Sequence, residues 1–203
     1  MGFADIDSGI DSVLHEDFIK DEVLQILQYN RRHVDFVSGI NEYPFTCPLD
    51  LHCQYNTNQI MAAFGYFTET VSPEFREGVK YFDDKLTDIF LINLNKSEKD
   101  FSPSTMYEDY AINAHLFHWE SQSQDREAST KIQRYIHHKE TDNHISLFVR
   151  EYKRIGAYTA PYTFLGDADY VSHENERPVS IVWKLHAAIP AELLPKANKS
   201  IAM

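Results

Sequence analysis

Several features that define common protein classes are scarce or absent in this 203-residue chain. Its 7 glycines are few for a fold built around glycine-rich phosphate loops. It contains no run of about 18 apolar residues, so the sequence predicts no membrane-spanning helix. The first 18 residues carry acidic side chains where a secretory signal would carry basic ones and then an apolar run. We therefore expect a cytoplasmic protein with no membrane partner.

The motifs of common enzymes are also missing. HExxH, GxSxG and GxxxxGK[ST] do not occur. The phospholipase-D-type nuclease signature begins at His137–Lys139, but His144 stands where that signature requires Asp. Asp88 with Glu98-Lys99 resembles a metal-nuclease set, although that set needs one residue between its second carboxylate and its lysine. We therefore predict no catalytic residues and no cofactor in this chain.

The chain has 2 cysteines, Cys47 and Cys53, in the segment CPLDLHC. Two cysteines in a chain of this length do not make a disulfide framework, and their spacing is not that of a zinc knuckle. The alternative is a zinc site with His52 as a further ligand, but a fourth ligand is not evident in the sequence. We interpret both cysteines as reduced thiols and predict no metal site.

The net charge of −12 argues against a large nucleic-acid-binding surface. The charge is unevenly distributed, however. Residues 1–100 carry 8 Lys/Arg and 18 Asp/Glu, whereas residues 101–203 carry 11 and 13. Within residues 126–154, seven basic side chains face four acidic ones, and three histidines accompany them. The sequence thus predicts a local basic face on an acidic protein.

Two helices are predicted near the N-terminus. The first covers residues 15–29, and the second covers residues 57–64, with Asn56 or Thr57 as its N-cap and Gly65 as its end. In the first helix, apolar residues recur at helical spacing on one face. These residues are Ile19, Val23, Ile26 and Leu27.

The second part of the chain is predicted to form β-strands. Residues 34–50 contain two prolines and are predicted to be a connector. After it and the second helix come short segments rich in β-branched and aromatic residues, which favour strands. The strand after the Asp83-Asp84 turn is almost continuously apolar, so we expect it at the centre of the sheet. The predicted strands are residues 78–82, 87–95, 115–121, 131–138, 144–153, 161–166, 168–173 and 179–186.

The predicted fold class is α+β. Turn residues separate the strands at intervals of roughly ten residues, which favours an antiparallel, curved sheet or barrel. The 13 Phe, 12 Tyr and 2 Trp residues suit such a sheet. We therefore expect N-terminal helices packed on a curved, antiparallel, β-barrel-like sheet. The predicted boundary separates a helical extension, residues 1–45, from the main domain, residues 46–203.

A series of motifs in a distinctive order marks a family resemblance. These are PLDLHCQYNTNQIMAAFG (48–65), REGVKYF (76–82), LNKSEKDFSPSTMYEDYAI (94–112), FHWESQS (117–123), RYIHH (134–138), LFVREYK (147–153), PYTFLG (161–166), YVSH (170–173) and RPVSIVWKL (177–185). Through them, residues 45–195 resemble the domain that closes bacterial proteins combining a phospholipase-D-like nuclease with a DEAD-like helicase. The resemblance extends to the C-terminal target-recognition domain of SauUSI-type restriction enzymes, which attack DNA containing 5-methylcytosine.

The resemblance implies a function in modification-dependent (type IV) restriction. It implies that residues 46–203 form an SRA-like domain that recognises a modified base. The expected partners are double-stranded methylated DNA and the helicase and nuclease domains of an ATP-dependent parent enzyme, of which this chain would be the C-terminal part. The family often has charged residues at the positions of Asn56 and Asn58, so no phosphate contact is carried over to that helix.

A domain that recognises a 5-methyl group is expected to rotate the base out of the duplex, because the methyl group offers only apolar contact in the major groove. The pocket then needs aromatic faces, a carboxylate for the amino group of cytosine, and donors for its ring nitrogen and carbonyl. Residues 101–123 contain all of these groups. The predicted base pocket consists of Phe101, Tyr107, Glu108, Asp109, Trp119, Glu120, Gln122 and Ser123. The alternative is that Trp119 belongs to the hydrophobic core.

Contacts to the DNA backbone require basic or hydroxyl side chains. The predicted set is Lys96, Lys99, Ser102, Ser104, Arg126, Lys131, Arg134 and His137. If residues 131–138 form a strand, alternation places Arg134 on the same face as Ile132 and Ile136. Arg134 is then, alternatively, a buried ion-pair partner.

Two other functions remain open at this point. A docking or regulatory module of a helicase-nuclease is favoured by the acidic first half of the chain, and a cryptic nuclease is the third possibility. If the base pocket is correct, Trp119→Ala and Asp109→Asn should lower the affinity for methylated DNA far more than they lower the melting temperature. Equal losses of both would assign these residues to the core.

Overall fold

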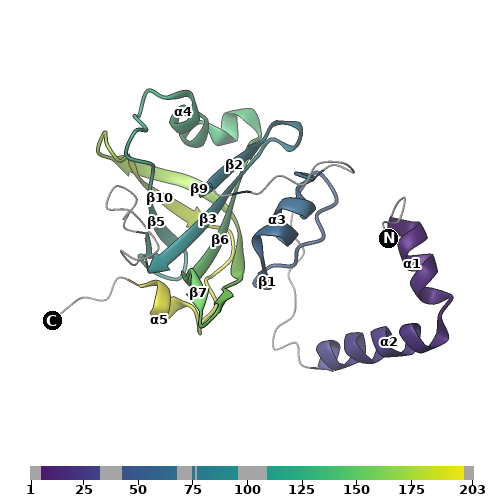
Figure 1. Cartoon of the computed structure of the whole chain (residues 1–203). Coiled ribbons are helices and arrows are strands. Elements are labelled where there is room, and N and C mark those ends of the chain that lie inside the picture. Colours follow the sequence, from purple (N-terminus) through teal and green to yellow (C-terminus); the bar gives the residue numbers. More distant parts are fainter. Residues whose placement is uncertain (1–5, 33–42, 68–74, 76, 96–108, 199–203) are drawn as a thin grey trace. The chain divides into compact units, whose positions relative to one another are not determined.

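The computed structural model describes residues 6–32, 43–67, 75, 77–95 and 109–198 (Figure 1). The chain divides into two compact units, Met1–Val37 and Ser38–Met203, and we describe each by itself. In the described segments, no helix is both long enough and apolar enough to cross a membrane.

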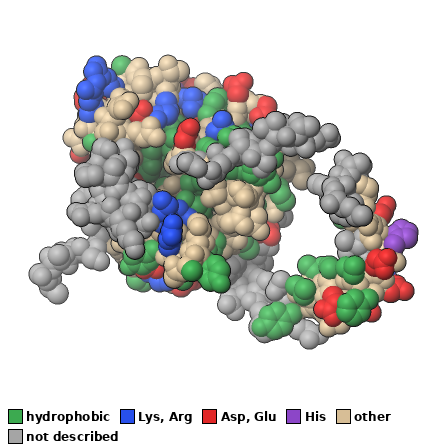
Figure 2. Space-filling model, viewed as in Figure 1, with side chains coloured by type: hydrophobic (Ala, Val, Ile, Leu, Met, Phe, Trp, Pro, Cys, Tyr) green, Lys and Arg blue, Asp and Glu red, His purple; other side chains and the backbone are tan. Residues whose placement is uncertain are grey.

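The N-terminal unit contains two helices, α1 (Ile6–Leu14) and α2 (Asp17–Arg32). The helix predicted over residues 15–29 is confirmed by α2. The sequence does not predict α1, because Gly9 and the serines on either side of it have low helix propensity. The large apolar side chains of α2 are exposed, and Figure 2 shows hydrophobic side chains on its surface.

The second unit is built around an eight-stranded sheet with the strand order β2-β3-β6-β9-β10-β5-β4, and β1 pairs with β9 outside this order. The strands of the sheet are β1 (Gln54–Tyr55), β2 (Val79–Phe82), β3 (Thr87–Asn95), β4 (Tyr110–Ala111), β5 (Leu116–Glu120), β6 (His144–Tyr152), β9 (Tyr162–Glu174) and β10 (Ser180–Leu185). Strands β7 (Arg154–Ile155) and β8 (Tyr158–Thr159) form a separate hairpin. The helical segments are α3 (Thr57–Ala63), α4 (Thr130–Ile136), α5 (Leu194–Ala197) and the 3₁₀ turns η1 (Asp83–Lys85) and η3 (His138–Thr141).

The topology confirms the predicted α+β class and the mostly antiparallel sheet. Among the described strands, β3 and β6 are the one parallel pair. This pairing is possible because the chain passes through β4, β5 and α4 before it returns to β6 in the direction of β3. The sheet ends at β2 and β4, so it is not closed into a barrel.

Strand β3 is buried on both faces. Phe90 and Ile92 belong to one core cluster, whereas Ile89 and Leu91 belong to the other. Successive residues of a strand point to opposite faces, so each cluster lies on its own side of β3. Helix α4 contributes to the first cluster and α3 to the second. The almost continuous apolar sequence of β3 correctly predicted its burial on both faces. The strand does not lie at the centre of the sheet as predicted, because it is second from the edge, beside β2.

The strand predicted over residues 131–138 is wrong, because this segment forms α4 followed by η3. The sequence of this segment fits both the alternation of a strand and the spacing of a helix, because its β-branched and aromatic residues also recur every three to four positions. Ile132 and Tyr135, three residues apart, are fully buried in the first core cluster. Tertiary packing of this helical face therefore decided the conformation, and the expected alternation at Arg134 does not apply.

The two strands predicted over residues 161–166 and 168–173 are one continuous strand, β9, of 13 residues. Gly166 lies inside it with φ +83, and the pairing with β6 shifts register beside it. The glycine therefore marks a β-bulge and not a turn. The positive φ favours glycine, and a Cβ atom here would lie 2.8 Å from Cδ1 of Leu51, so the Leu51 side chain would have to move.

Helix α3 has the ends that its sequence predicted. The Asn56 side chain accepts a hydrogen bond of 2.9 Å from the Gln59 N–H, and the Gln59 side chain accepts one of 2.9 Å from the Asn56 N–H. This reciprocal pair is a capping box. Gly65, with φ +73, follows the helix in the left-handed conformation typical of a helix end.

Candidate functional site

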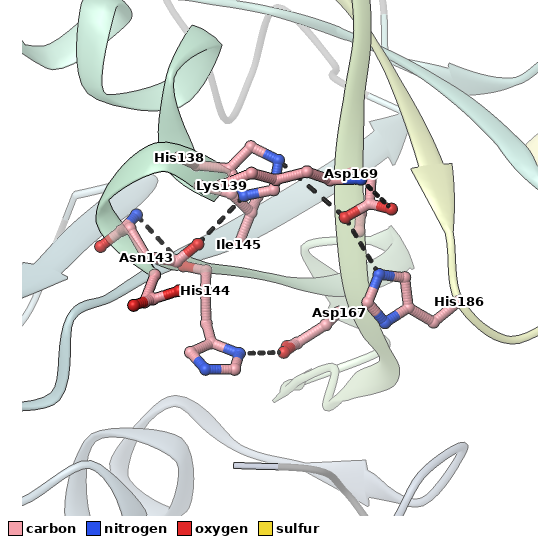
Figure 3. A pocket seen from close by; sticks show the side chains of 10 residues that line it. His138, Lys139, Asn143, His144, Ile145, Asp167, Asp169 and His186 are labelled. Atoms are coloured by element: carbon pink, nitrogen blue, oxygen red, sulfur yellow. Dashed lines mark hydrogen bonds and ion pairs between the residues drawn. The ribbon is translucent and has the colours of Figure 1, made fainter. Parts of the chain in front are cut away.

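A polar cleft of about 220 Å³ lies at the beginning of β6 (Figure 3). Its walls come from η3, the middle of β9 and the residue after β10, which the pairing of β9 with both β6 and β10 brings together. The cleft is lined by His138, Lys139, Asp142, Asn143, His144, Ile145, Asp167, Ala168, Asp169 and His186. Three histidines, one lysine and three aspartates from separate segments thus converge on one cavity.

Asp169 is held between two basic side chains in the cleft (Figure 3). Its Oδ2 lies 2.8 Å from Nζ of Lys139, and its Oδ1 lies 3.2 Å from Nε2 of His186. Burial raises the pKa of Asp169, but the hydrogen bonds from Lys139 and His186 outweigh burial and the net pKa is lowered. Asp169 is therefore a carboxylate at neutral pH, and it orders two donors along one wall.

A second hydrogen-bonded chain runs through Asp167. Nδ1 of His144 lies 2.7 Å from Oδ2 of Asp167, and the Ser146 hydroxyl donates to Oδ1 at 2.7 Å. The Tyr43 hydroxyl, whose pKa is raised chiefly by burial, contacts the Ser146 hydroxyl. Because Ser146 donates to the carboxylate, Tyr43 must donate to Ser146. The hydrogen bond with Asp167 raises the pKa of His144 against the opposing effect of burial, and it fixes the orientation of the ring.

His138 is a buried, neutral imidazole. Its Nδ1 lies 3.0 Å from the carbonyl oxygen of Asn143, which can only accept, and its Nε2 lies 3.1 Å from the N–H of Tyr170, which can only donate. These partners require the tautomer with the proton on Nδ1. Burial lowers the pKa of His138. The 4.0 Å approach of Nε2 to Asp169 is therefore not an ion pair at neutral pH.

His138 and His144 are expected to titrate on opposite sides of the ordinary histidine pKa. The raised pKa of His144 means that its bond with Asp167 stabilises the fold fully at low pH and is lost as pH rises through that pKa. The lowered pKa of His138 means that stability falls as pH drops below the ordinary value, because the unfolded chain then binds the proton first. NMR titration of the ring protons, assigned with His138→Gln and His144→Gln, tests this order, and two coincident titrations would contradict it.

Ile145 and Ala168 border the cleft, but each is 1% exposed and belongs to the first core cluster. The cleft therefore offers mainly carboxylate acceptors and ammonium and imidazole donors, which suits a small polar ligand. Although many of its residues are potential ligands, no group of three His, Cys, Asp or Glu side chains in the described chain is arranged to hold a metal ion. Cys47 and Cys53, the cysteines of the alternative zinc site, form no disulfide there.

A buried ion pair lies next to the cleft. Arg134 donates two hydrogen bonds of 2.7 Å to Asp88, which is 1% exposed, and its guanidinium stacks 3.8 Å from the centre of the Tyr81 ring. Asn143, which lines the cleft, donates to the same carboxylate at 3.0 Å. This geometry confirms the ion-pair alternative for Arg134, because its guanidinium is hydrogen-bonded to Asp88 within the domain.

Part of the predicted site lies outside the described residues. These positions are Phe101, Tyr107 and Glu108 of the base pocket and Lys96, Lys99, Ser102 and Ser104 of the backbone set. Their roles stay predictions.

Two of the remaining pocket residues are buried. Trp119 is 6% exposed, and its ring packs edge-to-face on Phe90 with centroids 4.7 Å apart. Asp109 is 7% exposed, and it accepts a hydrogen bond of 3.0 Å from the N–H of Glu120. The Trp119 ring therefore lies in the hydrophobic core, and the Asp109 carboxylate binds the backbone at the end of β5.

The other predicted residues lie at or near the surface. Glu120 is half-buried at the end of β5, and Gln122 and Ser123 are exposed in the following turn. Among the basic residues, Arg126 is exposed, Lys131 pairs with Asp125 at 2.6 Å, and His137 pairs with Glu140 at 2.9 Å. None of these described side chains lines the cleft, whose lining begins one residue after His137.

The residues of the cleft were not predicted as a site. One signal was present in the sequence, because Asp167 and Asp169 alternate with small residues in GDADY and must share one face of a strand. The histidines gave no such signal. His144 follows a turn and His186 follows β10, and only the pairing of β6, β9 and β10 brings them together.

Comparison with known proteins identifies a family. The family model described as "Domain of unknown function (DUF3427)" matches residues 49–196, which is most of the second unit. No curated protein matches the chain. The matched range contains every residue that lines the cleft. The chain therefore belongs to the DUF3427 family.

Proposed function

We propose that this chain is the recognition domain of a modification-dependent (type IV) restriction enzyme and binds double-stranded DNA that contains 5-methylcytosine. The nuclease and the ATP-dependent helicase would lie in other domains of the parent protein. Two observations support the proposal. The family match over residues 49–196 covers nearly the same range as the motifs that resemble SauUSI-type recognition domains. The cleft also supplies the carboxylates and donors that a rotated-out cytosine requires, and its flat rings are three imidazoles in place of the expected larger aromatic side chains.

The proposal rests on the cleft, because its hydrogen-bonding side chains complement the hydrogen-bonding groups of cytosine. A carboxylate accepts from the exocyclic amino group, and Asp169 and Asp142 supply carboxylates. The ring nitrogen and the carbonyl of cytosine need donors, which Lys139 and His186 supply next to Asp169. A cavity of about 220 Å³ offers room for one pyrimidine. We therefore move the proposed base pocket from the segment around Trp119 to this cleft.

The lining gives the methyl group little apolar contact, because Ile145 and Ala168 are each 1% exposed and belong to the first core cluster. Burial of one methyl group contributes about 0.8 kcal/mol. We therefore expect a modest preference for 5-methylcytosine over cytosine.

Binding assays with matched duplexes test the proposed function. Wild-type protein should bind a duplex with one 5-methylcytosine more tightly than the same duplex with cytosine, and both affinities should fall as salt rises. Asp169→Asn should weaken binding of the methylated duplex by about tenfold or more, since a charged hydrogen bond contributes about 1.5–3 kcal/mol. Glu176→Gln, an exposed carboxylate in the turn between β9 and β10, is the matched control and should bind like wild type. Equal affinity of the wild type for both duplexes would contradict the proposal.

A docking module for a helicase-nuclease is the second candidate. The observation that favours it is the exposed apolar surface of α2, which includes Phe18 at 78%, Ile26 at 57% and Leu27 at 57% exposed. Such a surface fits a protein partner better than a nucleic acid. In that case neither duplex is bound, and the chain co-purifies with its helicase.

A further inference from the structure

The hairpin of β7 and β8 has an unusual surface. It pairs Arg154 with Thr159 and Ile155 with Tyr158, and it turns at Gly156, where φ is +61. A side chain at Gly156 would meet nothing within 4 Å, so the tip of the hairpin is open to its surroundings. This is a small two-stranded ribbon, separate from the large sheet.

The hairpin exposes large apolar side chains. Tyr158 is 81% exposed, Ile155 is 66% exposed, and Tyr152 at the end of β6 is 51% exposed. Ile155 and Tyr158 are directly opposite each other in the register, so their side chains lie on the same face. Such a pair of neighbouring exposed apolar side chains is a candidate contact surface.

The charge of the hairpin is opposite to that of the protein. Residues 152–161, YKRIGAYTAP, contain Lys153 and Arg154 and no acidic residue, whereas the whole chain has a net charge of −12. Exposed aromatic and basic side chains close together suit a nucleic acid, whose phosphates attract the cations and whose base edges and sugars accept apolar contact.

The base of the hairpin is fixed to the domain. The N–H of Ala160 donates to the carbonyl oxygen of Lys153 at 3.0 Å, and Arg150 donates to the carbonyl oxygen of Ala160 at 2.9 Å. Arg150 is 7% exposed and lies 4.1 Å from the centre of the Tyr162 ring. The hairpin is therefore preorganised, and its insertion into a partner loses little conformational entropy.

We infer that the β7–β8 hairpin is a second contact with duplex DNA, entering a groove with Ile155 and Tyr158 while Lys153 and Arg154 face the phosphates. The major groove of DNA is wide enough for a two-stranded β-ribbon. The inference rests on the proposed function for duplex DNA as the ligand, and it adds a surface and a position on the DNA that the base pocket does not supply.

The length of β6 sets the distance between the two contacts. The cleft lies at the beginning of this strand, at His144, and the hairpin follows its end, at Tyr152. At about 3.3 Å per residue, the two ends are on the order of 26 Å apart. This distance corresponds to about 8 base pairs. The hairpin therefore cannot occupy the gap that the rotated-out base leaves in the duplex, and it must contact the duplex on one side of that base.

Two duplex lengths test the inference. One duplex carries a single 5-methylcytosine with about 5 base pairs on each side, and the other carries it with about 14 on each side, so that only the second reaches the hairpin in both orientations. Tyr158→Ala with Ile155→Ser should weaken binding of the long duplex by about tenfold, because it removes the apolar contacts of the hairpin with base edges and sugars in the groove. The short duplex should change less than about twofold.

Arg154→Gln separates the charged contact from the apolar one. For the long duplex, it should reduce the slope of log binding constant against log salt concentration by about the amount that one phosphate contact contributes. For the short duplex, the slope should not change. The control is Ile112→Ser, which removes another exposed apolar side chain outside the hairpin and should bind both duplexes like wild type. Melting curves should be unchanged in all of these variants because the side chains are exposed.

The outcomes separate this inference from the proposed function. Variants of the hairpin that bind the long duplex as tightly as wild type would overturn the inference, even if methylated DNA is still preferred. If wild-type protein shows no preference for methylated DNA but hairpin variants lose affinity for the long duplex, the proposed function fails and the inference stands. Capture of a protein through the hairpin, with no effect on DNA, would also overturn it.

Discussion

Asp88→Ala is expected to lower the free energy of unfolding by about 3–5 kcal/mol, because it leaves a partly buried guanidinium without its counter-ion. Arg134 donates two hydrogen bonds to this one carboxylate. Asn143 loses the same acceptor. Urea denaturation followed by far-UV circular dichroism measures the loss as a lower midpoint at an unchanged slope.

The double variant Asp88→Leu with Arg134→Met is the control for this prediction. It removes both charges, so no unpaired buried ion remains, and it should regain a large part of the stability. Asp84→Asn is a second control, because Asp84 pairs with Lys85 at the exposed surface of η1 and the substitution should leave the urea midpoint close to that of wild type. A loss in Asp88→Ala no larger than that in Asp84→Asn would show that the Asp88 pair does not support the fold.

The Asp88 pair also connects the core with the cleft. Asn143 bonds Asp88, and its carbonyl oxygen accepts from Nδ1 of His138, which sets the tautomer of that imidazole. Loss of Asp88 should therefore disturb the cleft before the whole domain unfolds. The NMR titration of His138 is the observable, and its pKa should move back toward the ordinary value if Asn143 shifts and the site opens to water.

Local sequence rules predicted those elements whose conformation depends on near neighbours. The ends of α3 follow from Asn56, Gln59 and Gly65, all within ten residues. The strands β3 and β6 follow from their own apolar residues. The segment of α4 could not be decided in this way, since KIQRYIHH fits a strand and a helix equally well. Packing of Ile132 and Tyr135 against strands far away in the sequence decided it.

The candidate site was harder to predict because it is made by strand pairing. His144 and Asp167 are 23 residues apart, and nothing in either segment indicates that they bond. The register of β6 on β9 places them together, and that register depends on the bulge at Gly166. The segment around Trp119, in contrast, looked like a site because many polar residues surround one large aromatic. In β5, alternation sends Trp119 to the core and its neighbours outward.

Trp119→Ala is expected to lower the free energy of unfolding by about 3–5 kcal/mol, as for other buried large-to-small substitutions. The indole packs against Phe90 and lies 6.0 Å from the Tyr135 ring, centroid to centroid, so its removal leaves a cavity between the sheet and α4. For a domain of this size the melting temperature should fall by about 10 °C. Calorimetry or fluorescence melting measures this directly.

The affinity for methylated DNA decides between the two roles of Trp119. If the ring belongs to the core, binding measured well below the melting temperature should change little, because Trp119 does not line the cleft. Tyr158→Ala is the matched control, since it removes an aromatic ring that is 81% exposed and should change stability by less than about 0.5 kcal/mol. A Trp119→Ala protein that melts like wild type but no longer prefers methylated DNA would return the base pocket to the segment around β5.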